Sequence, residues 1–320
     1  EDYLAWGYVP DTRSILKGVQ KLPAGHSLLL EHGKPMPRPL QWWDVSFAER
    51  RKGSTQDLEA ELLHLLRDAV TSRMVADVPL GAFLSGGVDS SSVVALMAEA
   101  SGQPVKTCSI GFDVAALDET GYAEQVARQF GTDHRSRRVS PDDFEHVDTL
   151  AAMFDEPFAD ASALPTWRVS QLARENVTVA LSGDGADEAL AGYRRHVFLH
   201  GEDRARSLLP LGMRRAVFGT LGAIYPKADW APRPLRAKST LLALGQSSEE
   251  AYAAGIGVTG PDLRASLYTP DFERLRGDYR AEQPFVELMR GAVSREARGG
   301  SPLPAVREGQ QAERSRGHAQ

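Results

Sequence analysis

The sequence has 320 residues, of which 42% are apolar and 25% charged, and its formal net charge is −6. This composition is typical of a globular protein with one large domain or two modest ones, and the charge excludes a global basic surface for nucleic acid. No apolar run approaches the roughly 20 residues that a membrane-spanning helix requires. With a single cysteine, Cys108, and no leader pattern, we expect a reducing cytoplasmic setting and no partnership with nucleic acid or membrane.

The first 45 residues predict mostly irregular structure, because proline and glycine recur along them. One strand is expected at 26–32, ended by Gly33 and the prolines that follow. Since a lone strand pair buries little surface, this region is interpreted as the edge of something larger. A helix is predicted from about 55 to 75, because Ser54 is a favourable N-cap, Asp57 suits the first turn and leucines recur at helical spacing.

Strand-like and helical segments then alternate along the chain. The strands are expected at 78–84, 105–112, 135–139 and 177–181, and the helices at 90–100, 119–130, 141–154 and 163–175. This alternation predicts an α/β fold with a parallel sheet and helices on both faces, in which ligands bind at the carboxyl ends of the strands.

The remainder of the chain is expected to be different. From 186 to about 288 the pattern is mostly helical, interrupted by the proline-rich 226–234. This predicts a helical lobe beside the sheet. From Gly291 the periodicity disappears and polar residues dominate, so we expect 291–320 to be a disordered tail.

The loop Ser85-Gly86-Gly87-Val88-Asp89-Ser90 lies where the first of these strands gives way to a helix. Glycines let backbone amides approach a ligand, and a helix that begins there directs unpaired amides and its positive dipole end at the same point. The loop therefore predicts a phosphate cradle. Because it lacks the Gly-Lys-Ser/Thr of a Walker A loop and carries Asp89 instead, we expect a divalent cation, Mg²⁺ by default, between this acid and the phosphates. A glycine turn with a serine N-cap is the alternative.

A second loop, Ser182-Gly183-Asp184-Gly185, repeats this pattern after the fourth predicted strand, and Asp187 and Glu188 follow in the first turn of the next helix. Two strand ends of one parallel sheet can face each other across a crevice. We therefore expect Asp89, Asp184 and Asp187 to hold Mg²⁺ beside phosphates bound by both loops. An acidic helix N-terminus that complements the helix dipole is the alternative.

These two loops, at this separation, resemble the synthetase domain of glutamine-dependent asparagine synthetases. The first is similar to the family's pyrophosphate-binding loop, and further similar blocks follow in family order at 109–112, 118–123, 131–134 and 155–160. The stretch 3–26 resembles the end of the family's glutaminase domain. The resemblance implies an adenine nucleotide alpha hydrolase-like (PP-loop) fold. It assigns 1–45 to a glutaminase remnant and linker, 46–290 to the synthetase-like domain and 291–320 to the tail.

The resemblance also implies roles for individual residues. Enzymes of this family use Mg-ATP to convert aspartate into β-aspartyl-AMP and pyrophosphate, and then transfer ammonia from glutamine to give asparagine. Asp184 would be catalytic, and the metal ligands would be Asp89, Asp184 and Asp187. ATP would be bound by Leu84, Ser85, Gly86, Gly87, Asp89, Ser90, Ile110, Ser182 and Gly183. The pocket for the acceptor acid would be shaped by Asp155, Glu156 and Asp160. The partners would be aspartate, ATP and ammonia or glutamine, and a homodimer is compatible with the resemblance.

The sequence departs from the family pattern at both ends. The cysteine nucleophile of the glutaminase is not present, and Cys108 lies in a predicted strand, where a buried thiol is expected. Beyond Arg290 the family's lysine-bearing motif, whose cations neutralise phosphate charge, is missing. We therefore expect a truncated synthetase that binds nucleotide and turns over weakly. Two alternatives stay open: a relative that adenylates another carboxylate, and a non-catalytic nucleotide-binding fragment.

Overall fold

The computed structural model describes residues 1–11, 13–45, 51–114, 118–139, 145–226, 230, 232 and 237–297. The chain divides into two compact units. The helical unit consists of Glu1–Arg50, Glu156–Phe158 and Val197–Gln320, and the sheet unit consists of Arg51–Asp155 and Ala159–His196. Residues 1–45 fall in the same compact unit as most of the C-terminal helices. The domain boundaries expected at residues 45 and 290 stay a prediction.

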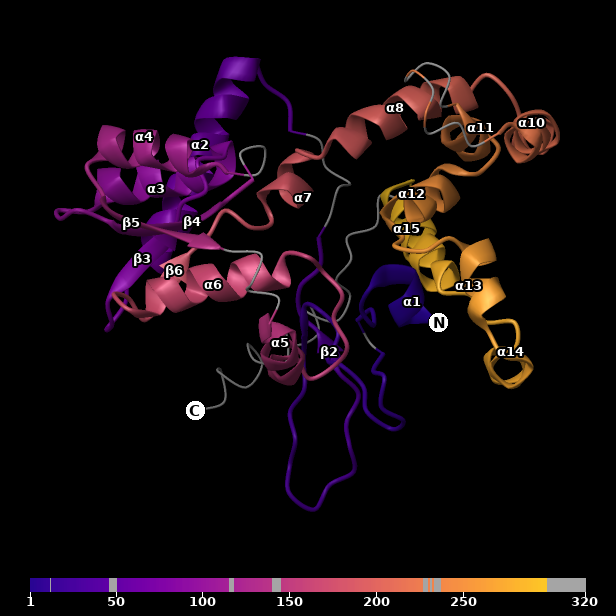
Figure 1. Ribbon diagram of the computed structural model, residues 1–320, viewed down its shortest axis with the longest axis horizontal. Helices are drawn as coiled ribbons and strands as arrows, with labels where there is room; N and C mark the ends of the chain where they lie inside the picture. Colours follow the sequence, from indigo (N-terminus) through magenta and orange to yellow (C-terminus); the bar gives the residue numbers. More distant parts are fainter. Residues whose placement is uncertain are drawn as a thin grey trace, which may run out of the picture. The chain divides into compact units, whose positions relative to one another are not determined.

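A four-stranded sheet forms the centre of the sheet unit (Figure 1). Its strand order is β5 (Asp133–Val139), β4 (Lys106–Phe112), β3 (Leu80–Phe83) and β6 (Val179–Leu181). Every neighbouring pair is parallel, which confirms the predicted parallel sheet. The strand β3 begins at Leu80 and not at 78, because Pro79 has no N–H for the ladder.

Helices cover both faces of this sheet, as predicted (Figure 1). On one face lie α3 (Val88–Ala100) and α4 (Thr120–Phe130), with α2 (Thr55–Arg73) packed against α3. The opposite face is covered by α6 (Ala163–Arg174), which contacts three of the four strands.

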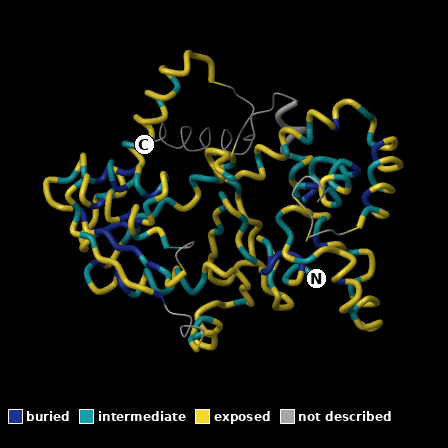
Figure 2. The backbone as a smooth tube through the Cα atoms, turned by 45° about the horizontal axis from the view of Figure 1, so that its top comes forward, coloured by how far each residue is buried: buried dark blue, intermediate teal, exposed yellow. Residues whose placement is uncertain are grey.

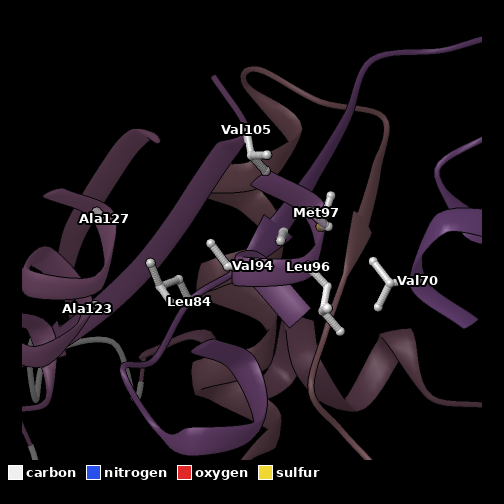
Figure 3. Packing of buried hydrophobic residues seen from close by; sticks show 9 residues of the cluster. Val70, Leu84, Val94, Leu96, Met97, Val105, Ala123 and Ala127 are labelled. Atoms are coloured by element: carbon white, nitrogen blue, oxygen red, sulfur yellow. The ribbon is translucent and has the colours of Figure 1, made fainter. Parts of the chain in front are cut away.

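Each face has its own apolar cluster. The cluster under α3 and α4, drawn in Figure 3, consists of Val70, Ala82, Leu84, Val94, Leu96, Met97, Val105, Ala123 and Ala127. The cluster under α6 consists of Cys108, Leu172, Ala173 and Val177. Consecutive strand residues alternate between the two clusters, since Ala82 belongs to the first while Phe83 packs against the second. Burial raises the pKa of the Cys108 thiol to about 11, which confirms the expected buried thiol.

Local signals set several helix ends. Ser54 and Asp57 form a capping box at the start of α2, as the sequence indicated. Gly131 ends α4 with φ +63°, in the left-handed conformation that glycine adopts without strain. The helix expected at 141–154 corresponds to α5 (Val147–Met153), and residues 140–144 lie outside the described residues.

Helices, most of them short, make up most of the helical unit. They are α1 (Asp2–Trp6), α9 (Leu211–Arg214), α10 (Thr220–Ile224), α11 (Lys238–Leu244), α12 (Ser248–Ile256), α13 (Pro261–Leu267), α14 (Pro270–Arg276) and α15 (Glu282–Ala297), with a π-helical turn at Arg215–Gly219. The helix α7 (Ala186–Leu190) belongs to the sheet unit, and α8 (Arg194–Arg206) has its first three residues in the sheet unit and the rest in the helical unit. The backbone of α15 continues to Ala297, beyond residue 290 where we expected regular structure to end.

The core of the helical unit is small. It is formed by Ala5, Trp6, Ala253, Ala281 and Val286. The strand expected at 26–32 is reduced to β1 (His26–Ser27), which pairs antiparallel with β2 (Leu40–Gln41). No described residue between 13 and 45 is buried; Figure 2 shows the backbone coloured by burial.

No helix among the residues described has both the length and the apolar character needed to cross a membrane.

Candidate functional site

A pocket of about 550 Å³ lies at the carboxyl edge of the sheet, entirely within the sheet unit. Three neighbouring strand ends line it. The end of β4 and helix α6 form an apolar wall, the loop after β3 supplies serine and glycine, and the loop after β6 supplies acids. Because neighbouring strands are about 4.8 Å apart, this order of apolar, amide-rich and acidic lining extends over roughly 10 Å.

The loop after β3 is held by its own serines. The Ser85 and Ser90 hydroxyls lie 2.9 Å apart, the Ser85 N–H donates to Ser90 Oγ at 3.2 Å, and the Gly87 N–H donates to Ser85 Oγ at 3.2 Å. Gly87 is the N-cap of α3 and has no side chain to cap the first turn. The amides at the start of α3 are therefore available to an anion.

Gly86 does not line the pocket, although we assigned it to the nucleotide with its neighbours. Its φ is +87°, and a β-carbon there would lie 2.5 Å from Tyr122 Cβ and 2.6 Å from the Ala123 N atom. Glycine is required because the backbone is left-handed and because α4 packs directly against the loop. The role of Gly86 in nucleotide binding stays a prediction, and its structural role is to shape the loop.

The two loops, expected to face each other across a crevice, are in direct backbone contact. A β-carbon on Gly183 would fall 2.7 Å from the backbone N atom of Ser90 and 2.8 Å from the carbonyl carbon of Asp89. Only a glycine allows this backbone contact. All the other residues assigned to ATP also line the pocket: Leu84, Ser85, Gly87, Asp89, Ser90, Ile110, Ser182 and Gly183.

The acidic end of the pocket is formed by Asp89, Asp184, Asp187 and Glu188. The Ser182 hydroxyl donates to Asp184 Oδ2 at 3.1 Å and accepts from the Asp184 N–H at 3.3 Å, so it orients that carboxylate. The carboxylate of Asp187 occupies the space over Gly192, where a β-carbon would lie 2.0 Å from Asp187 Oδ1.

The arrangement of these carboxylates suits Mg²⁺ that is also bound by phosphate and water, rather than a metal whose ligands all come from the protein. No three His, Cys, Asp or Glu side chains of the described residues come together as a metal-binding group. Mg²⁺ commonly takes one or two protein carboxylates and completes its shell with phosphate oxygens and water. Separate acids beside an amide-rich loop fit that chemistry, and the assignment of Asp89, Asp184 and Asp187 as ligands stays a prediction.

Sequence analysis did not identify every residue that lines the pocket. Tyr193 donates to Glu188 Oε1 at 2.5 Å, a bond that lowers the pKa of Glu188 and raises the pKa of Tyr193. The guanidinium of Arg195 lies 4.2 Å from the centre of the Tyr193 ring. The helix α7 ends at Ala191, which has φ +56°. Periodicity gives no sign of this left-handed helix end, so the sequence did not indicate that Tyr193 reaches the pocket.

The three acids assigned to the acceptor acid have other contacts. Glu156, in the helical unit, accepts from Lys21 Nζ at 2.7 Å and from the Ile15 N–H at 3.0 Å, and these bonds, Lys21 first, lower its pKa to about 2. Asp160 accepts from the Ser162 N–H at 2.7 Å, which lowers its pKa. Asp155 is exposed. None of the three is among the described residues that line the pocket, and their substrate role stays a prediction.

Known proteins share this sequence pattern. The sequence model of the asparagine synthase family matches residues 61–297. A putative glutamine-hydrolyzing asparagine synthetase 2 of Methanocaldococcus jannaschii is 41% identical over 65% of this chain and 40% of its own length. The glutamine-hydrolyzing asparagine synthetase 1 of Bacillus subtilis is 33% identical over 60% of this chain and 30% of its own length. The chain thus spans two-fifths or less of the length of these relatives.

Among solved structures, the NH3-dependent NAD synthetase of Campylobacter jejuni matches 76% of this chain and 97% of its own, with 12% identity and a TM-score of 0.31. An overlap of this size carries no conclusion about function, and the fold rests on the parallel sheet itself. The family match covers most of the chain and includes both pocket loops, and we conclude that the chain belongs to the asparagine synthase family.

Proposed function

We propose that the sheet unit binds Mg-ATP and adenylates the side-chain carboxylate of aspartate, giving β-aspartyl-AMP and pyrophosphate, so that ammonia derived from glutamine can then form asparagine. The order of the pocket lining is the main support: an apolar wall, then amides, then acids, across β4, β3 and β6. Mg-ATP presents its base, its phosphates and its metal ion in an order that matches these three linings. Family membership and the relatives' names support a ligase of this type.

The loop after β3 would bind the phosphates that leave. First-turn amides of α3 donate to phosphate oxygens, and the positive end of the helix dipole favours their charge. Ser85 and Ser90 keep those amides in place through their bonds within the loop. The site would therefore stabilise pyrophosphate as a leaving group without rearranging.

Asp89, Asp184 and Asp187 would hold the metal. Bound Mg²⁺ would neutralise phosphate charge and so assist departure of pyrophosphate. In the first step a carboxylate oxygen of aspartate forms a bond to the α-phosphorus of ATP, and the bond from that phosphorus to the bridging oxygen breaks. In the second, ammonia attacks the acyl carbon and AMP leaves. Ser182 orients Asp184 for this work through its 3.1 Å hydrogen bond.

Aspartate-dependent exchange of labelled pyrophosphate into ATP by the full chain tests the proposal. We expect exchange with aspartate, and we expect Asp184→Asn to reduce it by about 10²–10³-fold, as for other groups that stabilise transition-state charge. The matched control is Glu175→Gln, which removes a carboxylate paired with Arg137 on the surface of the same unit and outside the pocket lining.

Two results would contradict the proposal. Mg-ATP binding by calorimetry without any aspartate-dependent exchange would show a nucleotide-binding fragment. Exchange that depends on another carboxylic acid and not on aspartate would show a relative with a different acceptor.

A further inference from the structure

The pocket is lined by acids that no base of its own balances. Its described lining contains no lysine, arginine or histidine, and its carboxylates are those of Asp89, Glu119, Asp184, Asp187 and Glu188. A nucleoside triphosphate would add further negative charge, of which a bound Mg²⁺ offsets only a part. A further cation near the acidic end of the pocket would therefore stabilise the bound phosphates.

A cation lies next to this end, in the first turn of α8. The guanidinium of Arg195 lies 4.2 Å from the centre of the Tyr193 ring. Tyr193 lines the pocket, and its hydroxyl donates to Glu188 Oε1 at 2.5 Å. The bond from Tyr193 lowers the pKa of Glu188, and the nearby charge of Arg195 acts in the same direction. The guanidinium therefore rests against a side chain of the pocket wall and acts on the charge of that wall.

The hydrogen-bond donors of Arg195 are not used within the protein. Its exposed side chain makes no hydrogen bond or ion pair with any residue that the structure describes. Arg137 of the same unit is, by contrast, paired with Glu175 at 2.8 Å. An arginine that lies on an aromatic face keeps its N–H groups for another partner, and its planar fork can bind phosphate through two parallel hydrogen bonds. Arg195 thus combines a place beside the pocket with unused donors that suit an anion.

We propose that Arg195 binds the β- and γ-phosphates of the nucleotide, the group that leaves as pyrophosphate, and that the Tyr193 ring is the platform from which its guanidinium turns to them. The bond to Glu188 holds that ring in the pocket wall. A change of side-chain rotamer carries the guanidinium toward the phosphates while the backbone of α8 stays in place. The inference rests on the proposed binding of Mg-ATP, and it does not depend on which acid is adenylated.

Calorimetric titration of the full chain with Mg-ATP and with AMP tests this inference, because AMP lacks the two phosphates in question. Arg195→Gln should raise the Kd for Mg-ATP by about 10- to 100-fold, the size of hydrogen bonds to a charged group, and leave the Kd for AMP unchanged. Arg195→Lys keeps the charge without the fork and should give a smaller loss. Arg194→Gln is the matched control, since it removes the same charge from the neighbouring residue, whose side chain has no contact with the Tyr193 ring in the described structure.

The role of the ring is tested by repeating Arg195→Gln in two backgrounds. Tyr193→Phe keeps the aromatic platform, so Arg195→Gln should still weaken Mg-ATP binding by about the same factor. Tyr193→Leu removes the platform, so Arg195→Gln should then add little further weakening.

An arginine that only covers the surface predicts a different pattern. Arg195→Gln would then change the Kd for Mg-ATP no more than Arg194→Gln does, and this outcome would overturn the inference. Equal weakening of Mg-ATP and AMP by Arg195→Gln would overturn it too, because the effect would not come from the outer phosphates. Failure of the proposed function is recognised separately, as missing aspartate-dependent exchange in a chain whose Mg-ATP binding still depends on Arg195. A wild-type chain that binds no Mg-ATP overturns both.

Discussion

The sheet unit and the helical unit bury different kinds of side chain. The largest fully buried side chains of the sheet unit are Leu84, Met97 and Val94, which share one apolar cluster. In the helical unit the corresponding side chain is Arg264, which is 1% exposed and pairs with Glu1 and Glu282. A core built on apolar area tolerates rearrangement, whereas a core built on a buried cation requires each partner of that cation.

Other arginines of the helical unit follow the same pattern. Arg214 donates to the carbonyl oxygens of Leu209, Leu244 and Gln246, and it is 7% exposed. These are carbonyls at or near helix ends, which cations stabilise. The helical unit is therefore organised by hydrogen bonds between side chains and backbone, more than by apolar area.

Removing the buried cation should give the largest effect. Arg264→Met keeps the length of the side chain but leaves the buried carboxylate of Glu1 and the half-buried carboxylate of Glu282 without this cation. We expect the helical unit to lose about 3–5 kcal/mol of stability, as for other broken buried ion pairs. Urea denaturation followed by hydrogen exchange in α12, α13 and α15 measures the loss.

The sheet unit supplies the comparison for that variant. Met97→Leu changes the shape of a fully buried side chain and should cost less than about 1.5 kcal/mol. Arg274→Met, which removes an exposed ion pair with Asp271, should cost about 1 kcal/mol or less. Equal losses for Arg264→Met and Met97→Leu would mean that the two units do not differ in the way described.

The glycine pair of the first loop should give a smaller effect. Gly86→Ala places a β-carbon against Tyr122 and Ala123 in a left-handed backbone, and we expect a loss of about 1–3 kcal/mol in the sheet unit. Gly87→Ala is the matched control, because its β-carbon would meet only Ser85 Oγ, at 3.4 Å. Chemical denaturation of both variants measures the difference. Equal stability of the two would show that α4 yields to the added methyl group.

The smallest expected effect is a dependence of stability on pH in the helical unit. The pKa of Glu156 is lowered from 4.5 to about 2, mainly by its bond with Lys21. A carboxyl whose pKa falls on folding stabilises the folded state above its unfolded pKa, and the contribution disappears as the pH falls through the folded pKa. The stability difference between the wild type and Glu156→Gln should therefore shrink between pH 4.5 and 2.

Urea midpoints measured across that pH range provide the check. Glu31→Gln, at an exposed pair with Lys34 in the same unit, is the control and should change little. A difference between wild type and Glu156→Gln that stays constant down to pH 2 would contradict the role of this ion pair.

The sheet unit was largely predictable, and the reason is periodicity. Alternating apolar strands and amphipathic helices indicated the parallel sheet, and the two glycine loops followed from their place at strand ends. The two loops were expected at one edge because parallel strands end there, whereas the backbone contact of Gly183 with Ser90 was not predicted. Gly86 was assigned to nucleotide binding because it belongs to the loop motif at 85–90, whereas its contacts are with α4.

The helical unit was less predictable, because its contacts join residues that no period connects. Tyr268 donates to Glu1, and Lys21 pairs with Glu156, across long stretches of sequence. The expected strand at 26–32 shortened to two residues, since its apolar side chains Leu29 and Leu30 find no layer to cover them and remain exposed. In the sheet unit, Tyr193 lines the pocket two residues after the left-handed Ala191, which periodicity does not indicate.

The contact of Gly183 with Asp89 and Ser90 has a consequence for cooperativity. It joins two backbones with no side chain between them, so neither loop can shift without displacing the other. A ligand that immobilises one loop thereby meets part of the entropic cost of ordering the second, and the next ligand binds more tightly than it would alone. In such a pocket the order in which two ligands bind changes the free energy of each binding step but not the total binding free energy, since the coupling is reciprocal.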